Sequence, residues 1–295
     1  MKTFKTLVAT AAVGALLSAC GGGGDDGPQP AAVASASASV ARYGQPVIFT
    51  VNGSNLDQGL SATAGACNDF SLSTTPPFVS TATTAYIRCT VDRVGQHSLN
   101  VLRSSDGALL ATVQFNVEVP QVTLNFGGAV NGSLVVTLEP QRAPITVTNF
   151  LSYVNSGFYT NTVIHRHAPN FVLQGGGYAA PLSSAGNLPL TKATGAPIAL
   201  EDASGLLNLR YTLSMARTNQ SDTATTQFFI NLANNPNLDR TATQRGYAVF
   251  GSITSDIGVV TAMTAARCSS WPAFFGNGDC LPEPNIVITS ATQTR

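Results

Sequence analysis

The stretch Gly157–Gly177 reads GFYTNTVIHRHAPNFVLQGGG and decides the fold of the second half of the chain. Its residues 163–167 alternate in the way that is typical of a β-strand, in which successive side chains point to opposite faces of a sheet. The alternation predicts Arg166 on one face and His165 and His167 on the other. This strand therefore presents a single guanidinium to whatever lies on that face.

The residues that follow predict the second half of a hairpin. Pro169-Asn170 is expected to turn the chain, and the next strand is expected to place Phe171 on one face and Val172 and Gln174 on the other. A guanidinium, an apolar ring and an amide in one short hairpin indicate a site for an uncharged, partly apolar ligand. On spacing alone, an ordinary hairpin with a surface arginine remains the alternative.

Further sequence blocks follow this hairpin. They are LSMAR at residues 213–217, QFFIN at 227–231 and GYAVFG at 246–251. Together with Gly-Phe-Tyr, His-Arg and Phe-x-x-Gln-Gly-Gly-Gly in the opening stretch, their order and spacing resemble the cyclophilin-type peptidyl-prolyl isomerases, the last block in its bacterial form. The resemblance covers residues 121–295 and says nothing about the residues before them.

This resemblance implies an eight-stranded antiparallel β-barrel capped by two α-helices. It also implies cis–trans isomerisation of X–Pro bonds in proline-containing polypeptides, with no cofactor and no metal. Arg166, Phe171 and Gln174 match the family's catalytic positions, where the arginine donates to the imide nitrogen of the twisted bond and the glutamine orients the arginine. The positions that match the proline pocket and the adjoining peptide groove are Val172, Ala216, Arg217, Gln227, Phe229, Leu238 and Tyr247.

A few positions depart from the family pattern. Asn237 precedes Leu238 where relatives carry tryptophan or another aromatic residue, and Tyr247 stands where many relatives carry histidine. His167 replaces an aliphatic residue beside the arginine. None of these changes removes the catalytic group, so we expect an active isomerase with altered ligand affinity.

The composition indicates a two-domain, mainly β protein. A chain of 295 residues usually divides into domains of about 100 to 200 residues each. The net charge is zero and only 10% of the residues are charged, which argues against a nucleic-acid partner because such partners require a basic surface. Long amphipathic helical patterns are scarce, whereas β-branched residues, serine, threonine and glycine are abundant. We expect a monomer.

Residues 1–20 predict a lipoprotein signal peptide. Lys2 and Lys5 form a positively charged segment, and residues 7–17 form an apolar segment too short to span a bilayer. The stretch ends in Leu-Ser-Ala-Cys at Cys20, which resembles the bacterial lipobox. In lipoproteins that cysteine is linked to diacylglycerol and becomes the new N-terminus, so a membrane anchor is expected at Cys20.

The residues around the cleavage site predict the location. Gly21, in place of aspartate, points in lipoproteins to the outer membrane. Residues 21–34 are expected to form a flexible tether, because glycine-rich chains behave as coils. The chain is thus predicted to be a periplasm-facing lipoprotein of the bacterial cell envelope. The alternative is an ordinary signal peptide cut near Ala19, with Cys20 left free.

The cysteine content agrees with export. Of five cysteines, Cys20 is assigned to lipid, which leaves the pairs Cys67–Cys89 and Cys268–Cys280 as predicted disulfides. Disulfides persist in oxidising compartments, so reduced thiols in a cytosolic protein are the less favoured alternative. No Cys-x-x-Cys spacing is present, which argues against a redox motif or a zinc ribbon.

Residues 35–119 predict a small immunoglobulin-like β-sandwich. Turns are expected at Asn52-Gly53 and at residues 104–107, and His97 is expected to be an ordinary strand residue. No catalytic constellation is found here, so the module is interpreted as a spacer or a partner-binding surface. The runs predicted as strands are 46–52, 84–91, 97–102 and 110–117.

Residues 120–295, the isomerase-like domain, predict a hairpin and two helices. Asn131-Gly132 is a hairpin signal, Pro144 opens the first helix, and the second helix is expected to begin near residue 255. The residues expected to face inward are Val147, Phe150, Leu151 and Val154 from the first helix and Ile257, Val260 and Met263 from the second.

Other chemistries have weaker support in the sequence. His165 and His167 have the spacing of two metal ligands, but no third ligand is placed to complete a zinc site, and no serine-hydrolase motif is present. Glu201-Asp202 is expected to be a loop or strand end, and Trp271 to pack within the Cys268–Cys280 loop. The alternative to an enzyme is a non-catalytic, proline-peptide-binding or adhesin-like lipoprotein on the same scaffold.

Overall fold

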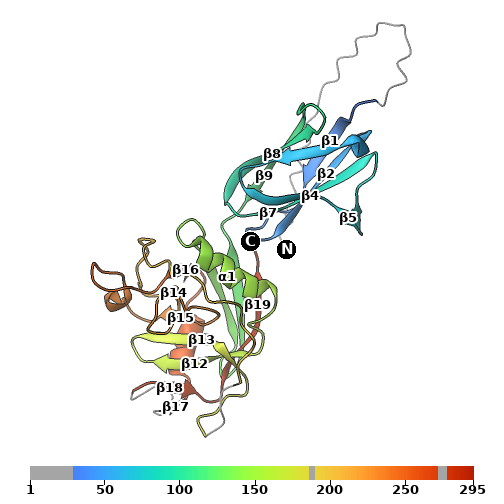
Figure 1. The fold of residues 1–295 in the computed structure, drawn as a ribbon. Helices are drawn as coiled ribbons and strands as arrows, with labels where there is room; N and C mark the ends of the chain where they lie inside the picture. The colour runs from blue at the N-terminus through green and yellow to red at the C-terminus, as the bar shows by residue number, and fades with distance from the viewer. Residues whose placement is uncertain (1–28, 186–189, 272–277) are drawn as a thin grey trace, which may run out of the picture. The chain divides into compact units, whose positions relative to one another are not determined.

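The computed structural model describes residues 29–185, 190–271 and 278–295 (Figure 1). The chain divides into two compact units, the first of which ends at Glu118 and the second of which begins at Val119. The predicted signal peptide, Cys20 and most of the predicted tether lie outside the described residues. In the described part, no helix is both long enough and apolar enough to cross a membrane.

The first unit is a β-sandwich, as predicted. Phe49 from one sheet and Phe115 from the other meet edge to face at a ring-centroid distance of 5.2 Å, and both are buried. One sheet has the order β1 (Ala32–Ala38), β2 (Pro46–Ser54), β7 (Thr84–Val91) and β4 (Cys67–Leu72). The other has the order β3 (Leu60–Thr63), β8 (Gly95–Arg103) and β9 (Leu109–Val117). The short elements are η1 (Leu56–Gln58), β5 (Thr74–Thr75) and β6 (Phe78–Val79).

Two predictions for this unit were wrong. Asn52-Gly53 is not a turn but part of β2, where Val33 pairs with Gly53. A Cβ at Gly53 would lie 1.9 Å from the Ala32 carbonyl oxygen, so the glycine allows close approach of the neighbouring strand rather than a reversal of the chain. The predicted tether also extends too far, because residues 32–34 already belong to β1.

The second unit is a closed eight-stranded antiparallel barrel, as predicted. The pairing between β12 and β13 closes it, and two short strands, β17 and β18, extend from β12. Around the barrel, the order is β13 (Val172–Ala179), β15 (Phe228–Asn231), β14 (Thr212–Met215), β16 (Val249–Ile253), β11 (Gly132–Leu138), β10 (Gln121–Gly128), β19 (Ile286–Gln293) and β12 (Thr162–Ala168). The short strands are β17 (Cys268–Ser270) and β18 (Cys280–Pro282).

Two α-helices accompany the barrel, α1 (Pro144–Asn155) and α2 (Gly258–Ala265). The stripe predicted for α1 is buried as expected, and so are Val260 and Met263 of α2. Ile257 was predicted to face inward, but its residue is 38% exposed. Ile257 is the N-cap residue of α2 and lies outside the helix itself. The helical periodicity therefore does not predict the direction of its side chain.

The aromatic core of the barrel is centred on Phe150 of α1. Its ring lies 5.3 Å from that of Tyr159, 5.7 Å from that of Phe228 and 5.0 Å from that of Phe250. All four rings are fully buried. The helix therefore stabilises the barrel by filling its interior with one large side chain.

The two predicted disulfides are present, one in each unit. Cys67–Cys89 joins β4 to β7, and Cys268–Cys280 joins β17 to β18. Each bond closes a loop within its own unit, with sequence separations of 22 and 12 residues. Such closures stabilise a fold by about 3 kcal/mol in the chain-entropy picture.

We predict that Phe150→Ala lowers the free energy of unfolding of the second unit by about 3–5 kcal/mol, because it removes the ring on which the aromatic core packs. Urea unfolding followed by the fluorescence of Trp271, the only tryptophan, reports on this unit alone. The matched control is Ile145→Ala on the same helix. Ile145 is 46% exposed, so truncating its side chain should change the free energy of unfolding by about 0.5 kcal/mol or less. Equal effects of the two changes would contradict this description of the core.

Candidate active site

The centre of the site is the antiparallel pairing of β12 with β13. Arg166 of β12 pairs directly with Gln174 of β13, and the Arg166 Nη1 donates to the Gln174 Oε1 at 3.1 Å. The turn between the strands holds Asn170 at a φ of 56°, a left-handed conformation that asparagine tolerates. Strand pairing and turn chemistry thus bring the guanidinium and the amide together, as the sequence predicts.

Behind Gln174 lies a second amide. The Gln174 Nε2 donates to the Gln227 Oε1 at 2.8 Å, so the Gln174 amide is held on both sides. A Cβ at Gly177 would lie 2.5 Å from the Gln227 side chain, and the glycine therefore makes room for this amide. Gln227, which is predicted in the groove that adjoins the pocket, is not part of the lining of the pocket itself and supports the Gln174 amide.

An apolar pocket of about 120 Å³ lies beside the guanidinium. Val172 and Phe229 of its lining form a buried cluster with Ala168, and partly buried apolar side chains pack around this cluster. Apart from Gln227, the pocket brings together every residue predicted from the resemblance. Its lining consists of Arg166, Phe171, Val172, Gln174, Ala216, Arg217, Phe229, Leu238 and Tyr247.

Phe171 departs from the strand alternation expected for it. The alternation placed it opposite Val172, yet both line the same pocket. Phe171 belongs to the turn before β13, where its N–H donates to the Ala168 carbonyl at 3.1 Å. Its own carbonyl accepts from the Asn235 Nδ2 at 3.0 Å, so a turn and a distant amide, rather than a strand, fix the direction of the ring.

The far rim of the pocket is built from Tyr247 and Arg217. The Arg217 guanidinium lies over the Tyr247 ring at 4.4 Å, and Tyr247 meets Phe229 edge to face at 5.6 Å. The short helix η2 (Pro236–Leu238) supplies Leu238 to the lining, whereas Asn237 beside it is exposed. An exposed asparagine therefore stands where the resemblance leads us to expect an aromatic residue.

Sequence reasoning missed one charged partner of the central arginine. The Arg166 Nε donates to the Asp279 Oδ2 at 2.6 Å, and both side chains are partly buried, at 27% and 17% exposure. Asp279 lies 113 residues further along the chain, directly before Cys280. No local pattern in the sequence marks this aspartate as a partner of Arg166.

The two histidines beside Arg166 face away from the pocket. Burial lowers the pKa of His165 to about 3, and its ring packs edge to face against Tyr178 at 4.7 Å. Burial also lowers the pKa of His167, an effect that the nearby Asp279 charge opposes. Both imidazoles are therefore neutral at pH 7, and neither contributes a positive charge to the site.

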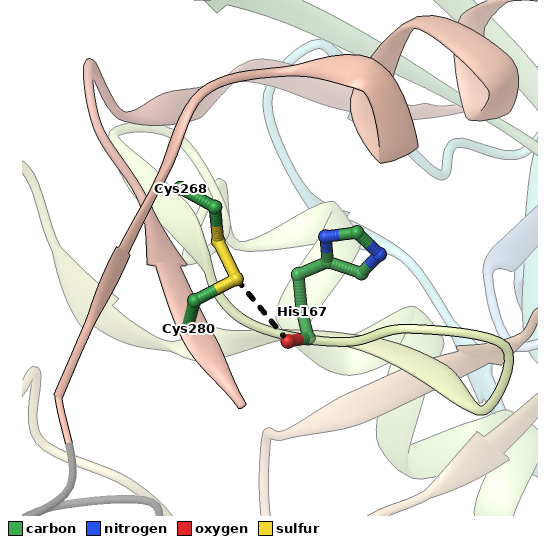
Figure 2. A group of neighbouring side chains, drawn as sticks. All are labelled: His167, Cys268 and Cys280. Carbon is green, nitrogen blue, oxygen red and sulfur yellow. Dashed lines mark hydrogen bonds between the residues drawn. A yellow bond between two sulfur atoms is a disulfide. The ribbon is translucent and has the colours of Figure 1, made fainter. Parts of the chain in front are cut away.

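His167 lies close to both cysteines of the second disulfide (Figure 2). One ligand atom from each of His167, Cys268 and Cys280 falls within 4.8 Å of the others, and this group does not include His165. The neighbours of His167 in this group are thus a cysteine pair, and not the second histidine, for whose spacing the sequence places no third ligand. A cysteine binds a metal as a thiolate. While the two sulfurs are bonded to each other, neither is a thiolate.

Glu201 and Asp202 have structural partners, in agreement with their interpretation as loop residues. The Glu201 carboxylate accepts from the N–H groups of Ile145 and Thr146 at 3.0 and 2.7 Å and so caps α1. Asp202 is buried and pairs with Arg240 and Arg245 at 2.9 and 2.8 Å.

Trp271 packs on a buried cluster of Val163, Leu182 and Leu281, so it joins the disulfide loop to the barrel.

Comparison with known proteins places this site in a family. The family model described as cyclophilin type peptidyl-prolyl cis-trans isomerase/CLD matches residues 121–293, more than half of the chain. The chain belongs to the cyclophilin family. Residues 121–293 are hereafter the cyclophilin domain, a peptidyl-prolyl cis–trans isomerase domain.

Several bacterial relatives match the cyclophilin domain closely. The peptidyl-prolyl cis-trans isomerase A of Dickeya dadantii is 41% identical over 160 residues, which are 54% of this chain and 78% of that protein. A peptidyl-prolyl cis-trans isomerase of Acinetobacter baylyi is 43% identical over 159 residues, 54% of this chain and 79% of that protein. A crystal structure of a Cryptosporidium parvum cyclophilin type isomerase covers 60% of this chain and 98% of its own, at 22% identity and a TM-score of 0.47.

We predict that the cyclophilin domain loses stability as the pH falls from 7 to 5. The unfolded chain protonates His165 below its ordinary pKa of 6.5, whereas the folded domain does not do so until about pH 3. The unfolded state then binds more protons, so His165 alone lowers stability by up to about 1.4 kcal/mol per pH unit below pH 6.5, and His167, whose pKa burial also lowers, acts in the same direction.

The measurement is urea unfolding followed by Trp271 fluorescence at pH 7 and pH 5. His165→Gln, which removes the titrating group, should show a clearly smaller loss over this interval than the unchanged chain. Glu283 has a lowered pKa of about 2 against an ordinary 4.5, so its protonation affects stability mainly below pH 4.5 and contributes little between pH 7 and pH 5. An identical pH dependence of the two chains would show that His165 is not held neutral by burial.

Proposed function

We propose that Arg166 catalyses the isomerisation by donating a hydrogen bond to the imide nitrogen as the X–Pro bond twists. The barrier to this rotation is about 18–20 kcal/mol, because rotation breaks amide resonance. A donor to the nitrogen lone pair removes it from resonance and stabilises the twisted state electrostatically. The supporting observation is a guanidinium at the edge of an apolar pocket, held at Nη1 by Gln174.

The apolar residues of the pocket would receive the proline ring. Phe171, Val172, Phe229 and Leu238 surround a volume that excludes water from one side of the bond. Burying the ring holds the bond beside Arg166 and lets binding contribute to positioning. No bond to hydrogen breaks in this reaction, so the proposed mechanism requires neither a cofactor nor a metal.

The polypeptide on either side of the proline would lie along the rim of the pocket. Ala216 and Arg217 follow β14, and in this proposal their backbone pairs with an extended peptide segment. Tyr247 supports this rim beneath the Arg217 guanidinium. The substrates are therefore proposed to be proline-containing polypeptides that reach the site in an extended conformation.

A proline-peptide-binding or adhesin-like protein without catalytic activity would require the pocket but not the guanidinium. The arginine and both amides behind it are present and hydrogen-bonded to one another, which supports catalysis over simple capture. Exchange of a prolyl peptide between its cis and trans forms, measured with and without Arg166, distinguishes the two functions.

We further propose that the protein acts on exported polypeptides from a lipid anchor at Cys20, in the bacterial cell envelope. The lipobox-like end of residues 1–20 and the glycine-rich residues after it support this location. Two disulfides also fit an oxidising compartment. The first unit is proposed to be a spacer or a partner-binding surface between anchor and enzyme.

We predict that Arg166→Ala lowers kcat/KM for a prolyl peptide by at least about tenfold, and by about a hundredfold if the donor contributes as much as comparable oxyanion-type donors. Thermal stability should change little, because the side chain lies at the rim of the pocket and is 27% exposed. The assay is protease-free cis–trans exchange by NMR.

Two controls accompany this variant. Arg166→Lys keeps the charge but loses the planar fork of donors, and it should remain clearly impaired. Arg93→Ala in the first unit, where the side chain is 69% exposed, should keep full activity. Unchanged turnover by Arg166→Ala would refute the proposed mechanism.

The anchor is tested separately with Cys20→Ser in a bacterial host. We expect the unchanged chain to incorporate labelled fatty acid and to remain with the membrane fraction, because each buried methylene contributes about 0.8 kcal/mol to membrane binding. The serine variant should incorporate no label and leave that fraction. A soluble, unlabelled Cys20 protein would overturn the lipoprotein assignment without touching the isomerase.

A further inference from the structure

We propose that Asp279 is a positioning residue for Arg166 and that the Cys268–Cys280 disulfide holds it in place. This inference rests on the proposed catalytic role of Arg166. It adds a residue outside the pocket to the machinery of isomerisation, and it gives the second disulfide a function beyond stability.

The first observation is the ion pair itself. The Arg166 Nε and the Asp279 Oδ2 lie 2.6 Å apart, at the short end of charge-assisted hydrogen bonds between a guanidinium and a carboxylate. Exposures of 27% and 17% place the pair between the surface and the interior, where water screens it less than it screens a surface pair. The carboxylate is thus able to direct the arginine side chain.

The second observation is the way in which the guanidinium is shared. The Arg166 Nε donates to Asp279 and its Nη1 donates to Gln174, whereas Nη2 has no hydrogen-bond partner in the described part of the chain. A planar guanidinium bound at two of its nitrogens has its orientation fixed, and the remaining donors point in a set direction. These donors are the ones available to the imide nitrogen of a substrate.

The third observation explains why Asp279 lies there. β18 pairs antiparallel with β12 through Cys280 and His167, the residues that directly follow Asp279 and Arg166. In this register Asp279 lies diagonally across from Arg166, within reach of a long side chain. The Cys280 Sγ also lies 3.6 Å from the His167 carbonyl oxygen, in close contact with the strand that carries the arginine.

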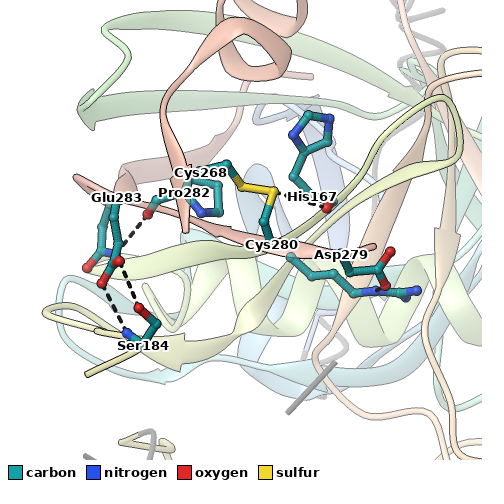
Figure 3. The surroundings of a disulfide bond; sticks show 9 residues. His167, Ser184, Cys268, Asp279, Cys280, Pro282 and Glu283 are labelled. Atoms are coloured by element: carbon teal, nitrogen blue, oxygen red, sulfur yellow. Dashed lines mark hydrogen bonds and ion pairs between the residues drawn. A yellow bond between two sulfur atoms is a disulfide. The ribbon is translucent and has the colours of Figure 1, made fainter. Parts of the chain in front are cut away.

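The fourth observation is how the segment carrying Asp279 is anchored. Figure 3 shows the disulfide beside the short strand β18, with Asp279 at one end of this strand and Glu283 at the other. Glu283 accepts from the Ser184 N–H and Oγ at 3.0 and 2.9 Å, and Leu281 is fully buried. These contacts secure the Glu283 end, whereas the disulfide secures the end at which Asp279 lies.

The expected effects follow from this geometry. Asp279→Ala should lower kcat by about tenfold, the usual consequence of losing a charge-assisted hydrogen bond to a catalytic group, and should leave KM nearly unchanged because Asp279 does not line the pocket. The isosteric Asp279→Asn keeps an oxygen acceptor but loses the charge, so its kcat should fall between those of Asp279→Ala and the unchanged chain.

The decisive experiment combines these variants with Arg166→Ala in the full chain. If Asp279 acts through Arg166, Asp279→Ala should lower the residual rate of Arg166→Ala by less than about twofold. In the unchanged chain, the Arg166 Nε–H should give a resolved, slowly exchanging NMR signal that Asp279→Ala abolishes. A general loss of structure would instead lower the rate in both backgrounds and shift signals throughout the domain.

The disulfide is tested with a matched pair of double variants. Cys268→Ser with Cys280→Ser should weaken the Arg166 Nε–H signal and lower kcat by about threefold or more, because the Asp279 end of the hairpin is released. Cys67→Ser with Cys89→Ser removes the bond of the first unit and should leave kcat unchanged. Full activity of the Cys268/Cys280 variant would remove the disulfide from the proposal.

The outcomes separate the inference from the proposed function. Active Arg166→Ala would refute the role of Arg166, and with it the inference. Inactive Arg166→Ala beside fully active Asp279→Ala and Asp279→Asn would overturn only the inference. An equal loss from Asp279→Ala in both backgrounds would also overturn it, because the aspartate would then act independently of the arginine.

Discussion

The hydrogen-bonded ladder between β12 and β13 is the constraint on which the second unit depends. It closes the barrel, and the same register sets Arg166 opposite Gln174. A Cβ at Gly175 would lie 2.6 Å from the end of the Ile164 side chain and 3.2 Å from the Val163 carbonyl oxygen, so glycine favours the close packing of the two strands there. A slip of one residue would turn every side chain of a strand to the other face, and it would thus open the core and dismantle the site together.

The features that the sequence predicts well are those with a local cause. The stripe on α1 follows from helical periodicity, and the hairpin turn from Pro169-Asn170. Asn52-Gly53 has the composition of a turn but lies within β2, because the requirement for close approach of the β1 backbone selects glycine as strongly as a turn does. Composition alone does not distinguish these two demands on a glycine.

The candidate site shows the same limit at longer range. The resemblance names the pocket residues, yet it does not show that Gln227 lies behind Gln174 or that Phe171 is directed by its turn. Asp279 is the clearest case, because it lies 113 residues from Arg166 and follows no periodic pattern. Its position depends on the pairing of β18 with β12. β18 has only three residues, which is too short for the sequence pattern to predict a strand.

The arginine is therefore supported from two sides that differ in physical character. Gln174 belongs to the barrel ladder, so its hydrogen bond persists as long as the domain is folded. Asp279 lies next to Cys280, which a covalent bond ties to β17, so in our proposal its contact depends on an oxidising environment. Asp279 is the carboxylate that forms an ion pair with this guanidinium in the described part of the chain. If Asp279 acts as proposed, oxidation of one cysteine pair completes both the fold and the orientation of the catalytic donor, which couples full activity to the compartment that the N-terminal residues indicate.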